Sequence, residues 1–451
     1  MRMALALSLM LWQAASCDSP RKPPVDAQVD VEDVQDMVDV EDVKDVKDTV
    51  EVPDGWPPRE NCSERPVHGQ NVGSHPYFFS VPYTTGGMLL FLGESGNLYT
   101  DGGRICDKVF GVNVWQQDLL RYDLLRREET ELVVYPARQF QPNEYQGKVY
   151  FTSAYTDYQE NPVGSHPWEG NPRAWLWEAG TAREYSTWCA PETGCTRAQV
   201  SKNGKMSYNQ YLPGSTPLAV TIMFHDLESL ETREVYQYRE APVTLAVGDR
   251  AIFWNHSSCG SFQYYDIEED RIVTASEYRV WSTKAWSDYI AWHNCVPEQN
   301  MVINLRTQEV RNLDEEMNLD PANKSCYLHT GYDEIVALVD RVRDVPEPGQ
   351  AAHLWLYDLE TRVQRRITSE AAKWTWGGMP IINCQWALIT LDYGKNGTNS
   401  RHYPNAVINL VEAGILDENC RLIPGLPLEF TLEEFLLACG FTLENYTSFY
   451  D

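Results

Sequence analysis

Basic residues are scarce in this sequence. Its 451 residues include 37 lysines and arginines against 65 aspartates and glutamates, which gives a formal net charge of −28 at pH 7. A protein that binds nucleic acids in general must displace counterions from their phosphates with positive side chains. The charge balance therefore excludes a general nucleic-acid binder. Hydrophobic residues are plentiful at 43%, and aromatic residues reach 12%, so the chain can still build a large core.

The apolar run near the N-terminus is too short to span a bilayer. It covers Met3–Trp12, follows Arg2, and leads through small residues to Cys17, which is the layout of a secretory signal. The four residues from Ala14 to Cys17 resemble the lipobox of bacterial lipoproteins, in which the cysteine is diacylated. The resemblance implies a signal peptide over residues 1–16 and a membrane anchor at Cys17. Ala14 stands where that family more often has leucine, and an ordinary secretory cleavage is the alternative.

No C-x-x-C pair occurs, which argues against a zinc site. Without Cys17, ten of the 11 cysteines remain, and an even number can pair completely in an oxidising compartment. Spacing leaves the connectivity open. Cys189 with Cys195 would close a local loop, and Cys420 with Cys439 would fasten the C-terminal tail.

An acidic segment follows the signal. Between Val25 and Asp54 the chain has twelve acidic residues and two lysines, with valines between them. Like-charge repulsion and low complexity oppose packing, so we expect residues 17–60 to be a disordered spacer. Calcium binding is the alternative, although the glycine and ligand pattern of a calcium loop is missing.

A short pattern repeats along the rest of the chain. An apolar strand ends in Asp or Asn followed in most copies by Leu or Ile, and a polar turn then leads to a second strand. The fullest copy is Leu354–Thr368. Six further copies are Tyr122–Val133, Trp175–Tyr185, His225–Val235, Tyr265–Val273, Ile303–Val310 and Val407–Leu416.

A second strand pair precedes most copies, so each repeat holds about four strands. Four strands cannot bury both faces of their sheet alone, but radial stacking of such units does. The sequence therefore predicts an all-β fold, a β-propeller of about seven four-stranded blades over residues 61–422. Six or eight blades are open alternatives, because the first copy is diffuse and ring closure can combine the two ends. Tryptophans such as Trp286, Trp292 and Trp386 are expected in blade cores.

The copy at Leu354–Thr368 resembles the repeat of TolB-type periplasmic propellers, which belong to the WD40-like folds. In that repeat a Tyr-Asp-Leu strand leads through a turn to a basic strand ending in Leu/Ile-Thr. The resemblance spreads weakly from about Val67 to Asp417 and implies the propeller fold. The chain lacks the repeated Ser-Pro-Asp-Gly turns and the N-terminal α/β domain of TolB, so TolB's partners are not transferred.

A short helix is predicted in the C-terminal tail, residues 423–451. Thr431 and Glu434 match a capping box, and Gly440 matches a C-terminal cap.

Candidate site residues are few. The sequence has no nucleophile elbow, phosphate loop, dinucleotide fingerprint or metalloprotease pair. It points to no catalytic residue and no cofactor. His256, His293 and His329 lie in successive repeats and are candidates for a binding site in the propeller channel, with a metal undetermined. Separate structural histidines are the alternative.

These observations predict a monomeric lipoprotein propeller outside the cytoplasm, on the periplasmic face of a membrane or on the cell surface. We expect a non-enzymatic binding or scaffold module for a protein, peptide or glycan, with no nucleic-acid partner. The alternative is an envelope polysaccharide hydrolase or lyase that uses channel histidines and carboxylates such as Asp266, Asp288 and Asp333.

Overall fold

Short antiparallel strands make up nearly all of the described chain. The computed structural model describes residues 77–81, 90–109, 112–133, 138–154, 173–185, 193–211, 220–238, 244–255, 260–318, 327–341, 352–368, 381–390, 405–428, 431, 433–434 and 437. The chain divides into two units, Met1–Thr49 and Val50–Asp451. The signal peptide, Cys17 and the acidic spacer lie outside the described residues. No helix within those residues is long and apolar enough to cross a bilayer.

Four sheets have four strands each, in chain order. They are β2 (Leu90–Leu92), β3 (Asn97–Val109), β4 (Val112–Asp123) and β5 (Glu128–Val133); β6 (Arg138–Tyr145), β7 (Lys148–Ala154), β8 (Arg173–Glu178) and β9 (Thr181–Glu184); β10 (Gly194–Val200), β11 (Lys205–Tyr211), β12 (Val220–Asp226) and β13 (Thr232–Tyr238); and β21 (Tyr327–Tyr332), β22 (Ile335–Arg341), β23 (Ala352–Asp358) and β24 (Gln364–Arg366).

A fifth four-stranded sheet joins the two ends of the described chain. It contains β25 (Ile381–Ile382), β26 (Trp386–Thr390), β27 (Asn405–Asn409) and β1 (Phe78–Ser80). The first strand, β1, pairs antiparallel with the last, β27, with Phe79 opposite Val407. The expected mixing of the ends at ring closure is therefore confirmed.

The sixth sheet has seven strands because the two halves of one long strand pair with different neighbours. Its members are β14 (Thr244–Val247), β15 (Ala251–Asn255), β16 (Gly260–Asp266), β17 (Arg271–Trp286), β18 (Tyr289–Cys295), β19 (Glu298–Asn304) and β20 (Glu309–Asn312). The first part of β17, Arg271–Ala275, pairs with β16, and its second part, Val280–Trp286, pairs with β18. The short helix α1 (Leu313–Glu316) follows β20, and the Asn312 side chain caps it.

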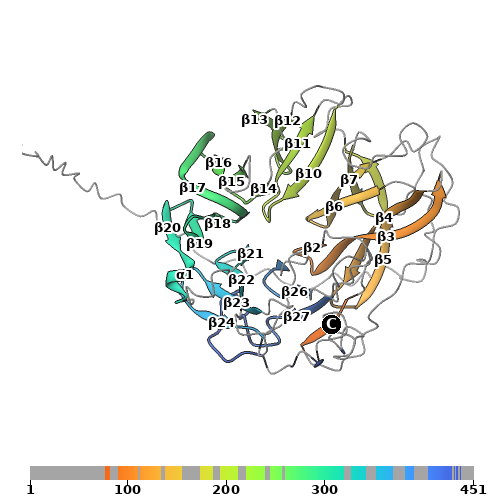
Figure 1. The fold of residues 1–451 in the computed structure, drawn as a ribbon. Helices are drawn as coiled ribbons and strands as arrows, with labels where there is room; N and C mark the ends of the chain where they lie inside the picture. The colour runs from red at the N-terminus through yellow and green to blue at the C-terminus, as the bar shows by residue number, and fades with distance from the viewer. Residues whose placement is uncertain are drawn as a thin grey trace, which may run out of the picture. The chain divides into compact units, whose positions relative to one another are not determined.

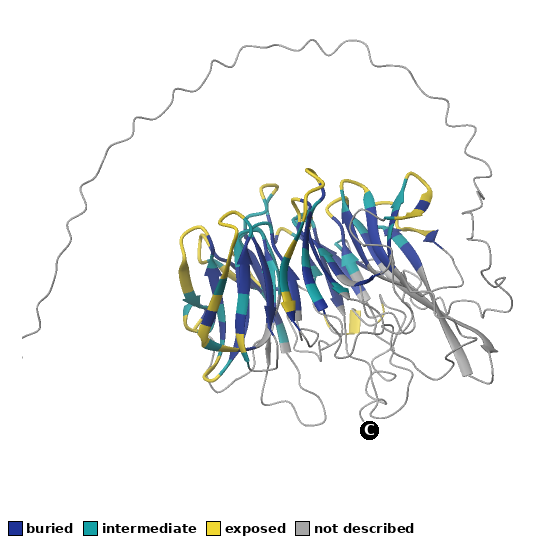
Figure 2. Cartoon of the chain, turned by 90° about the horizontal axis from the view of Figure 1, so that it is seen from above, coloured by how far each residue is buried: buried dark blue, intermediate teal, exposed yellow. Residues whose placement is uncertain are grey.

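Within the unit Val50–Asp451 the sheets follow one another around a common centre, in a propeller-like arrangement (Figure 1). Buried segments fill the strands, whereas many of the turns at one edge are exposed (Figure 2). The core lies between neighbouring sheets: Ile222 of β12 and Trp254 of β15, for example, share one cluster. Trp286, Trp292 and Trp386 are buried, as expected. The all-β, propeller-like prediction is thus confirmed.

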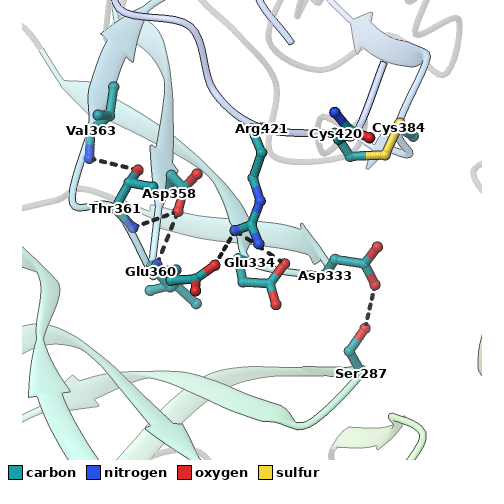
Figure 3. A network of polar contacts seen from close by, with 12 residues as sticks. Ser287, Asp333, Glu334, Asp358, Glu360, Thr361, Val363, Cys384, Cys420 and Arg421 are labelled. Carbon is teal, nitrogen blue, oxygen red and sulfur yellow. Dashed lines mark hydrogen bonds and ion pairs between the residues drawn. A yellow bond between two sulfur atoms is a disulfide. The ribbon is translucent and has the colours of Figure 1, made fainter. Parts of the chain in front are cut away.

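The recurring Asp or Asn has a local structural role. Asp358 ends β23, and its Oδ1 accepts hydrogen bonds from the backbone N–H groups of Glu360 and Thr361, each at 2.9 Å (Figure 3). The same side-chain turn follows β4, β12, β16 and β19. Such a turn satisfies backbone donors that would otherwise lack partners where the chain reverses. This explains why the residue recurs.

The capping box in the tail is formed. The backbone N–H of Glu434 donates to Thr431 Oγ1 at 3.1 Å, and the Thr431 N–H donates to Glu434 Oε2 at 2.7 Å. Glu433, Glu434 and Leu437 are helical, whereas Gly440 lies outside the described residues.

The prediction that Cys420 pairs with Cys439 is wrong. Cys420 forms a disulfide with Cys384, which lies 36 residues earlier in the turn between β25 and β26. After β27 the chain returns to this turn and brings the two Cα atoms to 5.0 Å. Cys195 and Cys295 are also disulfide-bonded. Cys189 and Cys439 are outside the described residues.

Candidate functional site

A cavity of about 380 Å³ lies at the centre of the ring. One strand at the inner edge of the structure contributes at each position around it: β2, β6, β10, β14, β17, β21 and β25. A concave space reached by side chains from many elements is the usual place for a binding site in such a fold.

A second hollow, of about 670 Å³, adjoins this cavity, and Lys202 and Ser287 line both. Turns between strands form most of its wall, and these turns carry charges of both signs. One exposed pair is Arg306 with Asp288, whose Nε and Oδ2 atoms lie 2.5 Å apart. We call this second space the mouth and the first the central cavity.

An ion pair crosses the ring where the two spaces meet. The Lys202 ammonium, in the turn after β10, donates to both carboxylate oxygens of Asp333, in the turn after β21, at 3.0 and 2.8 Å. Lys202 also lies over the Tyr332 ring, 4.6 Å from its centre. Ser287 donates to the same carboxylate at 3.2 Å (Figure 3).

A second contact crosses the ring beside the first. The Tyr332 hydroxyl donates to Glu94 Oε2 at 2.8 Å, although the two residues are 238 positions apart. Burial raises the pKa of Glu94 above its ordinary value, against the opposing effect of this hydrogen bond. Burial would lower the pKa of Lys202, but hydrogen bonds and charge at Asp333 and Tyr332 outweigh it, so this pKa is raised.

Further hydrogen bonds join neighbouring inner strands and turns around the mouth. The Trp286 indole N–H donates to the Asp333 carbonyl at 2.9 Å, and the Asp249 N–H donates to the Ser287 carbonyl at 2.9 Å. The Asn203 N–H donates to the Asp249 carboxylate at 2.9 Å. These bonds hold the inner turns in fixed positions relative to each other.

Glu144 is a second acid of the central cavity, only 6% exposed. It accepts a hydrogen bond from the Ser95 hydroxyl at 2.7 Å. A Cβ on Gly93 would lie 1.7 Å from Glu144 Oε2, so the missing side chain at position 93 makes room for the carboxyl group. Burial raises the pKa of Glu144. A buried carboxyl of this kind can hold a proton and pass it to a ligand.

Lys284 differs from the other charged groups of the central cavity. It lies on the inner part of β17 and lines the space, half-buried. In the part of the chain that the structure describes, no group lies within hydrogen-bond or ion-pair distance of its ammonium. Burial lowers its pKa, and no acid offsets the effect.

A further ion-pair group lies beside the mouth. Arg421, next to the bonded Cys420, extends toward Glu360 and Glu334 (Figure 3). Both acids line the mouth. The Cys384–Cys420 disulfide therefore fixes a cation next to this acidic side of the hollow.

The histidines predicted for the channel are not brought together in the described structure. His293 lies on β18, is 7% exposed, and has Nδ1 3.3 Å from Asn300 Oδ1; it does not line the central cavity. The backbone of His329 is part of β21, but its side chain is not described, and His256 is outside the described residues. Among the residues that are described, no three His, Cys, Asp or Glu side chains are grouped to hold a metal ion.

The predicted acids have separate places. Asp266 is 1% exposed and caps its turn, with Arg250 3.5 Å away, so it is structural. Asp288 and Asp333 line the mouth. No sequence pattern marked Glu94, Glu144, Lys202 and Lys284 as site residues. Their common signal is position: each lies within or just after an inner strand.

No protein-family model matches the chain, and no curated protein matches it. Solved structures with propeller folds are similar to it. An oligogalacturonate lyase in complex with manganese is 10% identical with a TM-score of 0.45, over 80% of this chain and 96% of that one. TolB from Acinetobacter baumannii is 10% identical with a TM-score of 0.33, over 67% and 79% of the two chains.

A Pyrococcus horikoshii acylaminoacyl peptidase is also similar, at 10% identity and a TM-score of 0.47. The match covers 71% of this chain and 52% of that one. TolB is thus among the propeller neighbours, and the likeness concerns the arrangement of the strands alone.

Proposed function

We propose that the chain is an extracytoplasmic lipoprotein whose propeller is a non-enzymatic binding module for a protein, peptide or glycan. The observation that carries the proposal is the mouth, a hollow of about 670 Å³ with charged turns around it. Bonds between neighbouring turns hold its wall before any partner arrives, which lowers the entropic cost of binding. Charges of both signs allow it to select a partner by complementarity.

We count the ring as seven blades. Two observations support this number: β17 serves first as an outer and then as an inner strand, and seven strands line the central cavity. The seven-stranded sheet is then two blades, and the five four-stranded sheets supply the others.

The proposed anchor is a diacylated Cys17, followed by the acidic spacer. The sequence from Ala14 to Cys17 supports it, and the disulfide-bonded cysteines of the propeller are consistent with an oxidising compartment. Intact mass of the membrane-extracted protein tests this. We expect two acyl chains on a new N-terminus at Cys17; a mature chain without acyl groups would contradict the anchor.

Binding at the mouth is tested with the full chain on glycan and peptide arrays, followed by titration of the best ligand. Arg306→Glu reverses an exposed charge within the mouth and should weaken binding at least tenfold. Arg183→Glu is the matched control, because Arg183 is equally exposed and ion-paired, to Glu178, but is not part of the mouth. Equal affinity of the two variants would contradict a site at the mouth.

The second candidate is an envelope polysaccharide hydrolase or lyase with its site in the channel. Glu94 and Glu144 favour it, because two acids with raised pKa values line one cavity, Glu144 buried and Glu94 exposed. Release of reducing ends or unsaturated products from a polysaccharide panel, lost in Glu144→Gln, would establish this activity in place of the binding role.

A further inference from the structure

The central cavity contains three polar side chains that have no partner within the described residues. Lys284 comes from β17, Gln199 from β10 and Thr330 from β21. The hydrogen bonds and ion pairs of the neighbouring residues do not include them. All three side chains are partly exposed and line the same cavity, so three donors that meet no protein partner there indicate a place for a polar ligand.

The chemistry of these groups selects the charge of the ligand. An ammonium, an amide NH₂ and a hydroxyl can each donate a hydrogen bond. A half-buried cation without a counter-ion is partly desolvated, and an anion beside it offsets that cost. The lowered pKa of Lys284, with burial as its cause, agrees with a cation that lacks its counter-ion.

The acids of the same cavity limit the ligand further. Glu94 and Glu144 already accept hydrogen bonds from Tyr332 and Ser95. Lys202 is neutralised by Asp333. Lys284 is therefore the cation of this cavity that has no ion-pair partner among the described residues, and one negative charge matches it; a phosphate dianion would add a second negative charge to a cavity that already contains two glutamates. A carboxylate has the right charge, and its two oxygens can accept from several donors.

We propose that the central cavity binds a small molecule with a single carboxylate, held by the Lys284 ammonium together with the Gln199 amide and the Thr330 hydroxyl. A cavity of about 380 Å³ admits a compact ligand and excludes a folded partner. The site is distinct from the macromolecule surface at the mouth and does not depend on it.

The test uses the full chain and three probes: acetate, lactate and gluconate, titrated by calorimetry at constant ionic strength. We expect saturable binding of at least one, and weaker binding of chloride and inorganic phosphate. Lys284→Met should weaken binding of the carboxylate at least tenfold. Lys148→Met is the control, because it removes the same charge from an exposed pair with Glu178 outside the cavity. Arg306→Glu at the mouth should leave carboxylate binding unchanged.

A second measurement does not depend on any variant. The acetylation rate of Lys284 by an amine-reactive ester, followed by mass spectrometry, should fall at least fivefold when the carboxylate saturates its site. Lys148 should react at the same rate with and without it. The proposal is overturned if no probe binds, if phosphate or chloride binds as well as the carboxylates, if Lys284→Met binds as tightly as the natural chain, or if Lys284 gains no protection.

Discussion

The two lysines of the ring centre have opposite environments. Lys202 bonds both oxygens of Asp333 and lies on the Tyr332 ring, and its pKa is raised. Lys284 has no partner among the described residues, and its pKa is lowered. The first holds together turns from distant parts of the chain, whereas the second contributes no bond to the folded state. The comparison separates residues that stabilise the centre from a residue available to a ligand.

The largest expected effect is at Gly331, which packs against Trp286 beside the residues that contact Lys202. A Cβ on Gly331 would lie 2.0 Å from the Trp286 ring, and this indole also donates to the Asp333 carbonyl. Gly331→Ala should therefore lower the free energy of unfolding by about 2–3 kcal/mol, as overpacking does. In a Trp286→Ala background the same change should cost less than about 1 kcal/mol, because the obstructing ring is gone. Urea unfolding of the natural chain, the two single variants and the double variant measures these changes. If Gly331→Ala lowers the free energy of unfolding equally with and without Trp286, the Trp286 ring is not the obstacle.

The two lysines themselves give the next effect. Lys202→Met should lower the free energy of unfolding by about 1 kcal/mol, a modest value because solvent partly screens the pair. Lys284→Met should raise it by up to about 1 kcal/mol without ligand, because an unpaired, half-buried charge is removed. Both variants lose one positive charge, so each controls for the other. If both substitutions changed the free energy of unfolding in the same direction, the two lysines would not have opposite environments.

The smallest effect concerns Glu144 and appears as a dependence on pH. Burial raises its folded-state pKa above the unfolded value, so the folded chain binds more protons between the two. Its contribution to stability therefore falls as pH rises from about 4.5, the ordinary pKa of a glutamate, through the folded pKa. Glu144→Gln should flatten this fall and raise the free energy of unfolding at pH 7 by up to about 1 kcal/mol.

Glu316 supplies the opposite case for that measurement. Its bond with Arg311 lowers its pKa, so its stabilising contribution is present above the unfolded pKa and is lost in acid. The free energy of unfolding, measured against pH from 2 to 8, should therefore change in opposite ways: Glu144→Gln removes a loss of stability above pH 4.5, and Glu316→Gln removes a loss of stability below pH 4.5. Parallel changes would argue against a raised pKa at Glu144.

Much of the fold could be predicted from the sequence because the interactions that form it are local. The Asp or Asn that ends each repeat fixes its own turn through hydrogen bonds two and three residues away, as at Asp358. Thr431 and Glu434 cap their helix over the same short range. Alternating apolar residues then require sheets that stack on each other, whatever their order in space.

The candidate site could not be predicted from the sequence, because its contacts join residues that are far apart in the chain. Lys202 meets Asp333 across 131 residues, and Tyr332 meets Glu94 across 238. Cys384 meets Cys420 only because the chain after β27 returns to the turn before β26. In the sequence each of these residues is an ordinary turn or strand residue.

The sequence by itself determined the strands, their turns and the need to stack them, since hydrogen bonds to near neighbours and apolar alternation act over a few residues. Only the tertiary structure decided which charges meet at the centre and which one is left without a partner. Ring closure brings the inner strands together, and their places around the ring put the Lys202 ammonium on the Asp333 carboxylate and leave the Lys284 ammonium without a partner among the described residues.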